Sequence, residues 1–367
     1  MERTRQLDQR TQTGAAGRMI LNENGTIDDL FAVKKLVACL TLNVDNGGGA
    51  PEALYVDAWR FAQRISVYLS NGKALASSIP VGLVDAVQAI NFKADAPATP
   101  LENAPTVTNG TGEVVQVFVE FPMAWKHTER ERDHWRSLSS VGTVAFDFAA
   151  TGYNTNITVN SITARLYAVG EKVNKVLIPP SLHLAYFSPS GQTTDQFSVM
   201  GHRVLSFLAA STDPTNEPIT DITGPAVYLD SELVTDGRQT LTINELQAVR
   251  GEDRYARTGY PPFGSGENRT SFAELYSAGY LAKLSELPPC KNVRVEYTAQ
   301  GIPNDELYYV CASLAPLTPA EAASQVPSFR GVQPEALARK AFRPTAGAGA
   351  VSGQLRQALP IAFDPTA

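Results

Sequence analysis

The sequence of 367 residues contains few of the side chains that build metal, cofactor and disulfide sites, with three cysteines and four histidines. The cysteines, Cys39, Cys290 and Cys311, are far apart, odd in number and without a C-x-x-C pair. This pattern argues against a disulfide framework or a zinc site and predicts buried free thiols. The four histidines are His127, His134, His183 and His202. Since none follows H-x-H, H-x-x-x-H or H-E-x-x-H spacing, we expect no metal centre and no cofactor.

Catalytic motifs are also missing from the sequence. It has no G-x-S-x-G nucleophile elbow, no Walker A loop and no G-x-G-x-x-G between a strand and a helix. The densest titratable cluster, 129–134, has its carboxylates interleaved with Arg130, Arg132 and Arg136. A run of mixed sign is usually a solvated helix face or an interface network, so we expect a short exposed helix over 126–138. The sequence therefore predicts a protein that is not an enzyme.

Long apolar runs and a strong positive charge are lacking as well. The best apolar stretch, Leu30–Val44, carries Lys34 and Lys35, so no membrane-spanning helix is expected. Met1–Arg18 has four arginines and no apolar core, which is unlike a secretory signal. The net charge is −6 and the isoelectric point about 5.4. Because a whole-chain basic footprint is absent, we expect no sequence-specific nucleic-acid partner.

What the sequence does contain is a series of strand-like runs. The clearest is Glu113–Phe121, in which Val115, Val117, Val119 and Phe121 share one face. Similar runs are expected at 31–44, 143–149, 157–169, 204–209, 293–297 and 307–314. Strands separated by long loops, with few helices, favour an all-β sandwich architecture. The length divided by about 150 residues favours two domains, and Pro179-Pro180 marks the expected junction.

A weak internal repeat suggests that the two halves are copies of one unit. The predicted hairpin turns at 71–73 and 236–238 are 165 residues apart (237 minus 72), and Glu120-Phe121-Pro122 and Glu286-Leu287-Pro288 are 166 apart. Asn-Gly and Asp-Gly between alternating runs are strong hairpin signals. Helix-like stretches follow the two turns, at 84–90 and 244–249. Chance similarity between two β-rich halves is the alternative explanation.

Both ends of the chain differ from its centre in composition. Residues 1–25 are polar and are expected to form an N-terminal arm, whose Arg3, Arg5 and Arg10 are candidate interface residues. Residues 317–367 are rich in Pro, Ala, Gly and Ser and are expected to form a C-terminal arm. Its basic–aromatic pairs are further interface candidates, namely Phe329, Arg330, Phe342 and Arg343.

Two tryptophans, Trp125 and Trp135, flank the charged run and are also candidate interface residues. Aromatic side chains are enriched at the cores of interfaces, and they also anchor helices to a protein body. A third interpretation is a stacking platform for sugars. The sequence leaves these interpretations open, with an interface or core position favoured.

This layout resembles the double jelly-roll major capsid proteins of tailless, membrane-containing icosahedral phages of the tectivirus and corticovirus types. The resemblance rests on the two β-rich units, the helix after the hairpin and the two arms, not on a diagnostic motif. It implies an all-β fold of two tandem eight-stranded jelly-roll sandwiches, at 26–175 and 176–316, with short inserted helices and extended N- and C-terminal arms.

The resemblance also implies a function and a set of partners. The chain would be a structural virion protein, a major capsid subunit that forms pseudo-hexameric homotrimers and tiles an icosahedral shell over an internal membrane. Its partners would be itself, neighbouring capsomers, and penton and minor capsid proteins, with membrane lipid reached through the arms. It would be located in the virion after assembly in the host cytoplasm.

Two other protein classes fit a β-rich chain. One is a carbohydrate-binding or carbohydrate-active β-sandwich, such as a phage fibre or depolymerase module, which the Trp and Tyr content favours but for which no carboxylate pair stands out. The other is a bicupin-like enzyme, against which the missing histidine triad argues. Assembly into trimers and shells would distinguish a coat protein from both.

Overall fold

In this computed structural model the described residues are 2–14, 16–48, 52–53, 62–91, 106–107, 110–125, 135–148, 156–188, 194–211, 222–236, 258–259, 271–278, 287–299 and 307–317. Almost all of them lie in β-strands. The compact unit that contains them spans Met1–Thr318. In the described part of the chain, no helix is long and apolar enough to cross a membrane.

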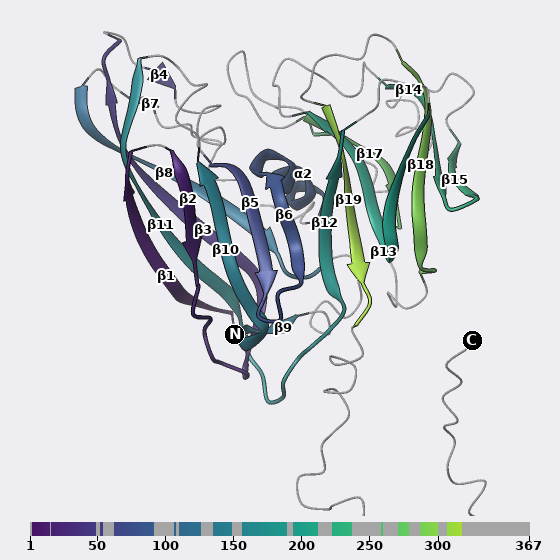
Figure 1. The fold of residues 1–367 in the computed structure, drawn as a ribbon, viewed down its shortest axis with the longest axis horizontal. Helices are drawn as coiled ribbons and strands as arrows, with labels where there is room; N and C mark the ends of the chain where they lie inside the picture. The colour runs from purple at the N-terminus through teal and green to yellow at the C-terminus, as the bar shows by residue number, and fades with distance from the viewer. Residues whose placement is uncertain are drawn as a thin grey trace, which may run out of the picture. The chain divides into compact units, whose positions relative to one another are not determined.

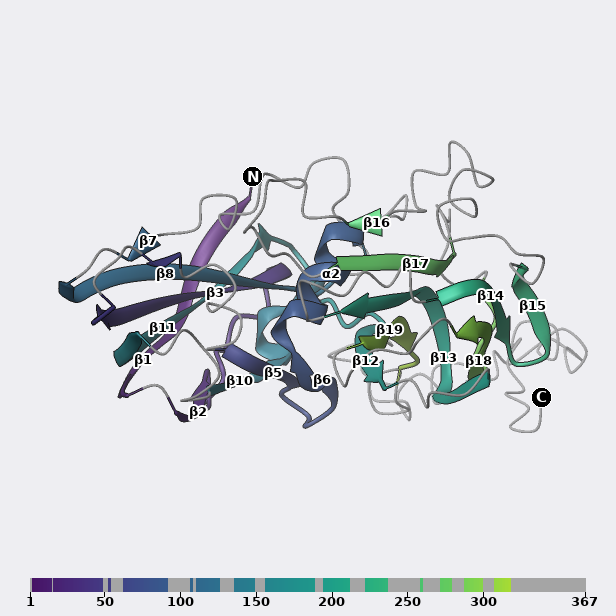
Figure 2. The same cartoon turned by 90° about the horizontal axis from the view of Figure 1, so that it is seen from above.

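The first half of the chain forms two facing layers of strands (Figures 1 and 2). One sheet has the order β1-β11-β3-β8, with β9 also paired to β3, and the second layer has the order β2-β10-β5-β6. The elements are β1 (Arg3–Thr13), β2 (Gly17–Leu21), β3 (Phe31–Asn46), β4 (Glu52–Ala53), β5 (Ala62–Leu69), β6 (Ala74–Pro80), α2 (Val81–Asn91), β7 (Thr106–Val107), β8 (Gly110–Pro122), β9 (Arg136–Ser137), the 3-10 helix η3 (Leu138–Ser140), β10 (Val141–Phe148) and β11 (Ile157–Lys172).

The second half contains another set of strands, which Figure 1 shows in green and yellow. They are β12 (Ser181–Phe187), β13 (Thr194–Ser211), β14 (Ile222–Leu229), β15 (Glu232–Asp236), β16 (Thr258–Gly259), β17 (Ser271–Ser277), β18 (Cys290–Ala299) and β19 (Leu307–Ala315). The long strand β13 serves two sheets. Its N-terminal part pairs with β18, and its C-terminal part pairs with β19 and β17.

The change of sheet within β13 occurs at a local backbone irregularity. Met200 and Gly201 have φ angles of +57° and +77°, and the pairing with β18 shifts register between Ser198 and His202. Positive φ angles at two consecutive positions bend the strand, as in a β-bulge. One strand can therefore run from one layer of the second half into the other.

The two halves have the same strand topology. In the first, the pairs are β1–β11, β11–β3, β3–β8 and β2–β10, β10–β5, β5–β6. In the second, with β13 divided at its bend, they are β12–β19, β19–β13, β13–β17 and β13–β18, β18–β14, β14–β15. Taken in chain order, the eight strands of one half correspond one to one with those of the other. The predicted duplication is therefore found in the strand pairing.

The core follows from the alternation of apolar residues along the strands. On β3, Leu36, Ala38, Leu40, Leu42 and Val44 are at most 2% exposed and pack in the largest hydrophobic cluster. Burial of each of the larger side chains in this row, Leu or Val, stabilises the fold by about 1.5–3 kcal/mol. A second cluster in the second half is rich in aromatic residues and cysteine, and consists of Val199, Val204, Phe207, Ala209, Val227, Leu275, Cys290, Val293, Val295, Tyr297, Tyr309 and Cys311.

The largest cluster also joins the two halves. Helix α2 contributes Val84 and Val87 to it, and strands of the second half contribute Leu208 and Val310. At the sheet edge, β6 and β12 share a parallel bridge between Ala76 and Leu184. The junction expected at Pro179-Pro180 lies between β11 and β12 and stays a prediction. The exact domain boundaries at 175 and 176 stay predictions, since 1–318 is one compact unit.

Several predicted elements are confirmed, and one predicted turn falls at the edge of the described residues. All seven predicted strands occur, as β3, β8, β10, β11, β13, β18 and β19, and the helix at 84–90 is α2. The hairpin at Asn71-Gly72 joins β5 to β6, with a Gly72 φ of +82°. In the second half, the hairpin between β14 and β15 turns at Asp230-Ser231. Of the turn expected at 236–238, only Asp236, the last residue of β15, is among the described residues. The helix expected at 244–249 lies outside the described residues.

Candidate functional site

The N-terminal segment that the sequence analysis assigned to an arm is built into the fold. Residues Arg3–Thr13 form β1, which pairs with β11, and Gly17–Leu21 form β2, which pairs with β10. The two strands lie in opposite layers, so this segment helps to close the first sandwich. The expected arm was wrong for residues 3–21, since a polar strand can gain its stability from backbone pairing.

The three arginines predicted for an interface accordingly lie on β1. Arg5 forms a short ion pair with Asp28, and the Arg10 Nη2 atom is 3.0 Å from Glu23 Oε2. Arg3 is exposed. These ion pairs are at the surface, where each contributes at most about 1 kcal/mol. Arg5 and Arg10 therefore hold the connection between β2 and β3 against β1, and Arg3 stays a candidate for contact with a partner.

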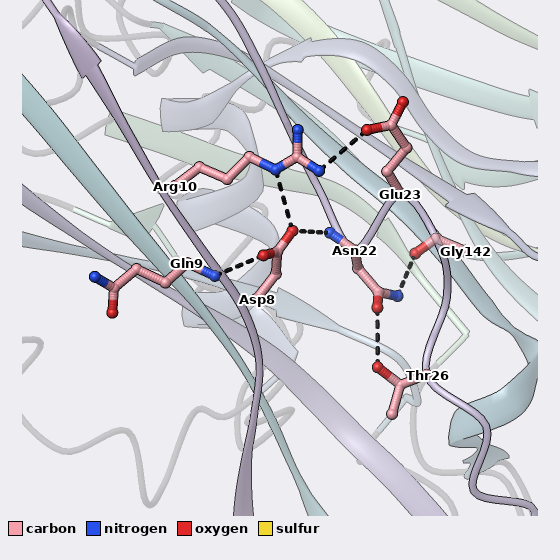
Figure 3. Close-up of polar contacts among 7 residues, drawn as sticks. All are labelled: Asp8, Gln9, Arg10, Asn22, Glu23, Thr26 and Gly142. Carbon is pink, nitrogen blue, oxygen red and sulfur yellow. Dashed lines mark hydrogen bonds and ion pairs between the residues drawn. The ribbon is translucent and has the colours of Figure 1, made fainter.

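Asp8 and Asn22 form the centre of this connection (Figure 3). Asp8 Oδ2 accepts a 2.8 Å hydrogen bond from the Asn22 backbone N–H, and Asp8 Oδ1 accepts one of 2.7 Å from the Gln9 N–H. The Asn22 side chain donates to the Gly142 carbonyl oxygen at 2.8 Å and accepts from Thr26 Oγ1 at 3.0 Å. The network thus links β1, the end of β2 and the start of β10.

The two predicted tryptophans lie in the interior. Trp125 is 3% exposed in the largest cluster, and Trp135 is 5% exposed beside Ala32 and Ala124. These positions support the core interpretation that the sequence left open, because almost no surface of either ring remains for a sugar or a second subunit. The other predicted interface residues, Phe329, Arg330, Phe342 and Arg343, lie outside the described residues, as do positions 126–134 of the charged run.

A surface that the sequence analysis did not single out is the outer face of the sheet β1-β11-β3-β8. Strand register places Gln9, Arg165, Cys39 and Phe118 in one row across the four strands. Arg165 Nε donates a 3.0 Å hydrogen bond to Gln9 Oε1. In the adjacent row along the sheet are Gln6, Tyr167, Val37 and Glu120.

This outer face has a composition typical of a protein interface. Tyr167, Phe118 and Val37 are half-buried, whereas their strand neighbours on the opposite side, such as Leu166, belong to the core. Lys35 and Glu120 form a 2.8 Å ion pair beside them. Aromatic residues and arginine are enriched at interfaces, and polar residues form the rim. We therefore regard this face as a candidate assembly surface.

Large apolar side chains that are exposed are few among the described residues. The large ones are Ile27, Leu30, Val114, Val176 and Met200. Ile27 and Leu30 lie between β2 and β3, and Val176 lies between β11 and β12. A 2.8 Å hydrogen bond from Val173 N to Leu30 O joins these two connections. Isolated exposed apolar residues are normal, so they do not by themselves mark a site.

The described residues contain no arrangement of side chains that suggests catalysis. They contain no group of three or more His, Cys, Asp or Glu side chains arranged to hold a metal ion. The three cysteines are buried and free, as predicted. Burial raises the pKa of the Cys311 thiol to about 12, and burial, followed by the charge of Asp230, raises that of Cys290. Such thiols are poor nucleophiles, because the thiolate is the reactive form.

The strand-pairing pattern that repeats between the two halves identifies the fold, and solved structures have the same fold. The crystal structure of the STIV (Sulfolobus turreted icosahedral virus) major capsid protein matches with a TM-score of 0.55 and 14% identity, over 86% of this chain and 97% of that one. The chain has the double jelly-roll fold. A chain in the atomic structure of the whole virus matches this double jelly roll with a TM-score of 0.55 and 15% identity, over 88% of this chain and 95% of that one. No protein-family description and no curated protein matches the sequence.

Proposed function

We propose that this double jelly-roll protein is a structural virion protein, the major capsid subunit of an icosahedral virus. The observation that carries the proposal is the duplication of one eight-stranded topology within one compact unit. Support comes from the matching structures, which are capsid components of a virus. At 14–15% identity they establish the fold alone, so the role is an inference from that fold.

The proposed assembly is a homotrimer with a pseudo-sixfold outline. Because each chain carries two sandwiches of equal topology, three chains present six similar units to a hexagonal lattice. Closed rotational symmetry is the rule for homo-oligomers, and a threefold ring needs head-to-tail contacts between different surfaces of the chain. The outer face that contains Tyr167 and Phe118 is our candidate for one of these surfaces.

The remaining parts of the proposal follow from this assembly. Neighbouring capsomers, penton and minor capsid proteins would be the partners, with the C-terminal segment 317–367 as a tether to neighbours or to the lipid of an internal membrane. The subunit would act in the virion, after assembly in the host cytoplasm, and would not be an enzyme. The candidate residues Phe329, Arg330, Phe342 and Arg343 belong to that tether.

The carbohydrate-binding alternative receives less support. It depended on aromatic side chains that are free to stack on sugar rings. Trp125 and Trp135 are both buried, so neither offers such a ring at the surface. No observation on the described residues favours a glycan site over an assembly surface.

Solution mass and particle shape test the proposal. Light scattering should give about 120 kDa (three times 39.5 kDa), and negative-stain images should show hexagonal outlines that associate into sheets or shells. A charge placed on the outer face, Tyr167→Glu, should shift the mass toward 39.5 kDa, whereas Ser231→Glu in the exposed β14–β15 turn serves as a control. A wild-type protein that stays monomeric at high concentration would overturn the capsid proposal and make glycan binding the next hypothesis.

A further inference from the structure

Two of the four histidines of the chain meet within the second jelly roll. His183 lies on β12 and His202 on β13, and both strands pair with β19. Their rings are 5.0 Å apart between centroids and inclined by 79°, in an edge-to-face contact. Since their sequence positions showed no ligand spacing, only the folded sheet brings them together. We call His183 and His202 the histidine pair.

Ser313 of β19 lies between the two histidines. It is the register partner of His183, is 1% exposed and has its Oγ atom 3.1 Å from His202 Nδ1. The same hydroxyl is 3.5 Å from the His183 carbonyl oxygen. Because the hydroxyl can donate or accept, it can bind the neutral imidazole in either tautomer, but it cannot neutralise an imidazolium.

A lysine from the first jelly roll reaches the same region. Lys73 belongs to the β5–β6 turn, where its carbonyl oxygen accepts from Leu69 N at 2.8 Å and its N–H donates to Asn71 Oδ1 at 3.0 Å. Its ammonium donates a 3.0 Å hydrogen bond to the carbonyl oxygen of Pro316. Pro316 directly follows β19, at the point where the chain continues toward its C-terminal segment. One side chain therefore joins the two jelly rolls at the root of that segment.

The surroundings of the pair keep both imidazoles neutral. Burial, and then the charge of Lys73, lowers the pKa of His183. Burial first, then His183 and Lys73, lowers the pKa of His202 to about 4. On β13 itself, Arg203 follows His202 and donates to the Leu287 carbonyl oxygen, and on the neighbouring strand β18 Cys290 is the register partner of His202. Within the described residues, the charges that act on the pair are thus positive.

The sign of the resulting pH dependence can be worked out. An imidazole in the unfolded chain has a pKa of about 6.5, so it binds a proton below that pH. In the folded chain the same proton binds only at a lower pH. Between about 6.5 and 4 the unfolded or locally opened chain binds more protons, so this part of the stability is present above pH 6.5 and is lost as the pH falls.

We propose that the histidine pair is a proton-sensitive latch at the junction of the two jelly rolls. When both imidazoles are protonated, they carry two positive charges near the Lys73 ammonium. Their mutual repulsion opens the contact between Lys73 and Pro316 and frees the end of β19. The latch would let acid pH loosen the end of β19 while the cores of the two sandwiches stay folded. This inference does not depend on the proposed capsid role.

Hydrogen exchange of the full-length protein tests the latch. After correction for the intrinsic effect of pH, peptides that cover 307–317 and 69–76 should open at least about tenfold faster at pH 4.5 than at pH 7.5. Peptides from β3 and β11 serve as the internal control and should not change. The double variant His183→Gln, His202→Gln cannot be protonated and should lose the acid response. Lys73→Gln, which removes one charge, should reduce it.

The titration of the histidines supplies a second, independent measurement on the wild-type protein. With ¹³C-labelled histidine, at most four imidazole signals are expected; the pKa of His183 should lie below that of a free imidazole, and that of His202 near 4. Single His→Gln variants assign them. Signals that titrate near pH 6.5, or an acid response that persists in the double variant, would overturn the proposal. If the double variant does not fold, the wild-type titration decides the question by itself.

Discussion

Asn22 and Gly142 are joined by a 2.8 Å hydrogen bond from the side-chain amide of one to the carbonyl oxygen of the other, although they are 120 residues apart in sequence. Asn22 is 5% exposed and has a φ of +54°, a conformation that Asn adopts more readily than most residues. Its backbone N–H also donates to Asp8. One residue therefore fixes the end of β2 relative to both β1 and β10.

Replacement of this residue should destabilise the first jelly roll. In Asn22→Ala, the carbonyl of Gly142 loses its buried donor, and alanine is strained at a positive φ. We expect a loss of about 2–4 kcal/mol in the free energy of unfolding, measured by urea denaturation. Asn22→Gly retains the backbone freedom but not the hydrogen bond, so it should lose less. Glu23→Ala, which removes only the surface ion pair with Arg10, should change it by under about 1 kcal/mol.

Gly170 on β11 makes the closest backbone approach among the described glycines. A Cβ atom at this position would lie 1.8 Å from the carbonyl oxygen of Ala32 on the paired strand β3. Because that neighbour is backbone in the centre of a sheet, it cannot move aside cheaply. Gly170→Ala should therefore cost about 3 kcal/mol or more, or abolish soluble expression.

A second glycine provides the matched control for this prediction. Gly47 follows β3, and a Cβ atom added there would have the Asn156 carbonyl oxygen as its nearest neighbour, at 4.0 Å. Gly47→Ala should thus change the melting temperature by no more than a degree or two. Equal melting temperatures for the two variants would show that the tight pairing of Gly170 with β3 is wrong.

The sequence was most informative where one face of a strand is buried. In Glu113–Phe121 every second residue from Val115 to Phe121 is apolar, and the run lies within β8 with Val115, Val119 and Phe121 in the core. The polar strand β1 could not be predicted in the same way, because Leu7 is its only apolar residue and its stability comes from pairing with β11. Periodicity detects burial of side chains and not hydrogen bonding of the backbone.

The duplication was predicted correctly from partly misplaced markers. The second-half hairpin that matches the Asn71-Gly72 hairpin turns at Asp230-Ser231, although Asp236-Gly237 has the stronger turn signal in the sequence. Asp230 has a φ of +53°, and its Oδ1 accepts hydrogen bonds from the backbone N–H groups of Lys291 and Asn292 on β18. A contact with a residue about 60 positions away selects this turn. Local sequence cannot report such a contact.

The candidate surfaces also could not be predicted from local sequence. Trp125 and Trp135 looked like interface residues because aromatic side chains suit both interfaces and cores, and only the three-dimensional packing distinguishes the two. The histidine pair was invisible because it is assembled from two strands through a third, β19. Both results depend on which strands are neighbours, which is a property of topology and not of spacing along the chain.

The buried cysteines allow a test of the core of the second jelly roll. Cys290 and Cys311 lie in its aromatic cluster, Cys39 is buried on β3, and burial raises the pKa of Cys311 to about 12. At pH 8 the Cys311 thiol is therefore protonated, and all three thiols are shielded by burial. Ellman's reagent should react with them far more slowly than after unfolding in guanidinium, when three thiols per chain should appear. Ser231→Cys, in an exposed turn, should add one fast-reacting thiol. Rapid reaction of the native wild-type protein would show that the core opens readily.

The sequence analysis predicted arms at both ends of the chain, and truncation can test whether the two ends have the same role. Deletion of residues 1–21 removes β1 and β2, so β11 loses its edge partner in one layer and β10 loses its partner in the other. Unpaired edges of this kind expose backbone groups and favour aggregation, so we expect an unfolded or insoluble product, as judged by near-UV circular dichroism and gel filtration.

Deletion of residues 319–367 leaves the compact unit 1–318 intact. If the chain forms the proposed trimer, that product should keep the trimer mass and its melting temperature within about two degrees, but it should form fewer particles if the C-terminal segment tethers neighbours. A folded trimer after the N-terminal deletion would contradict the position of β1 and β2 in the sheets, whereas loss of the trimer after the C-terminal deletion would show that the tail holds the trimer together and does not act only between capsomers.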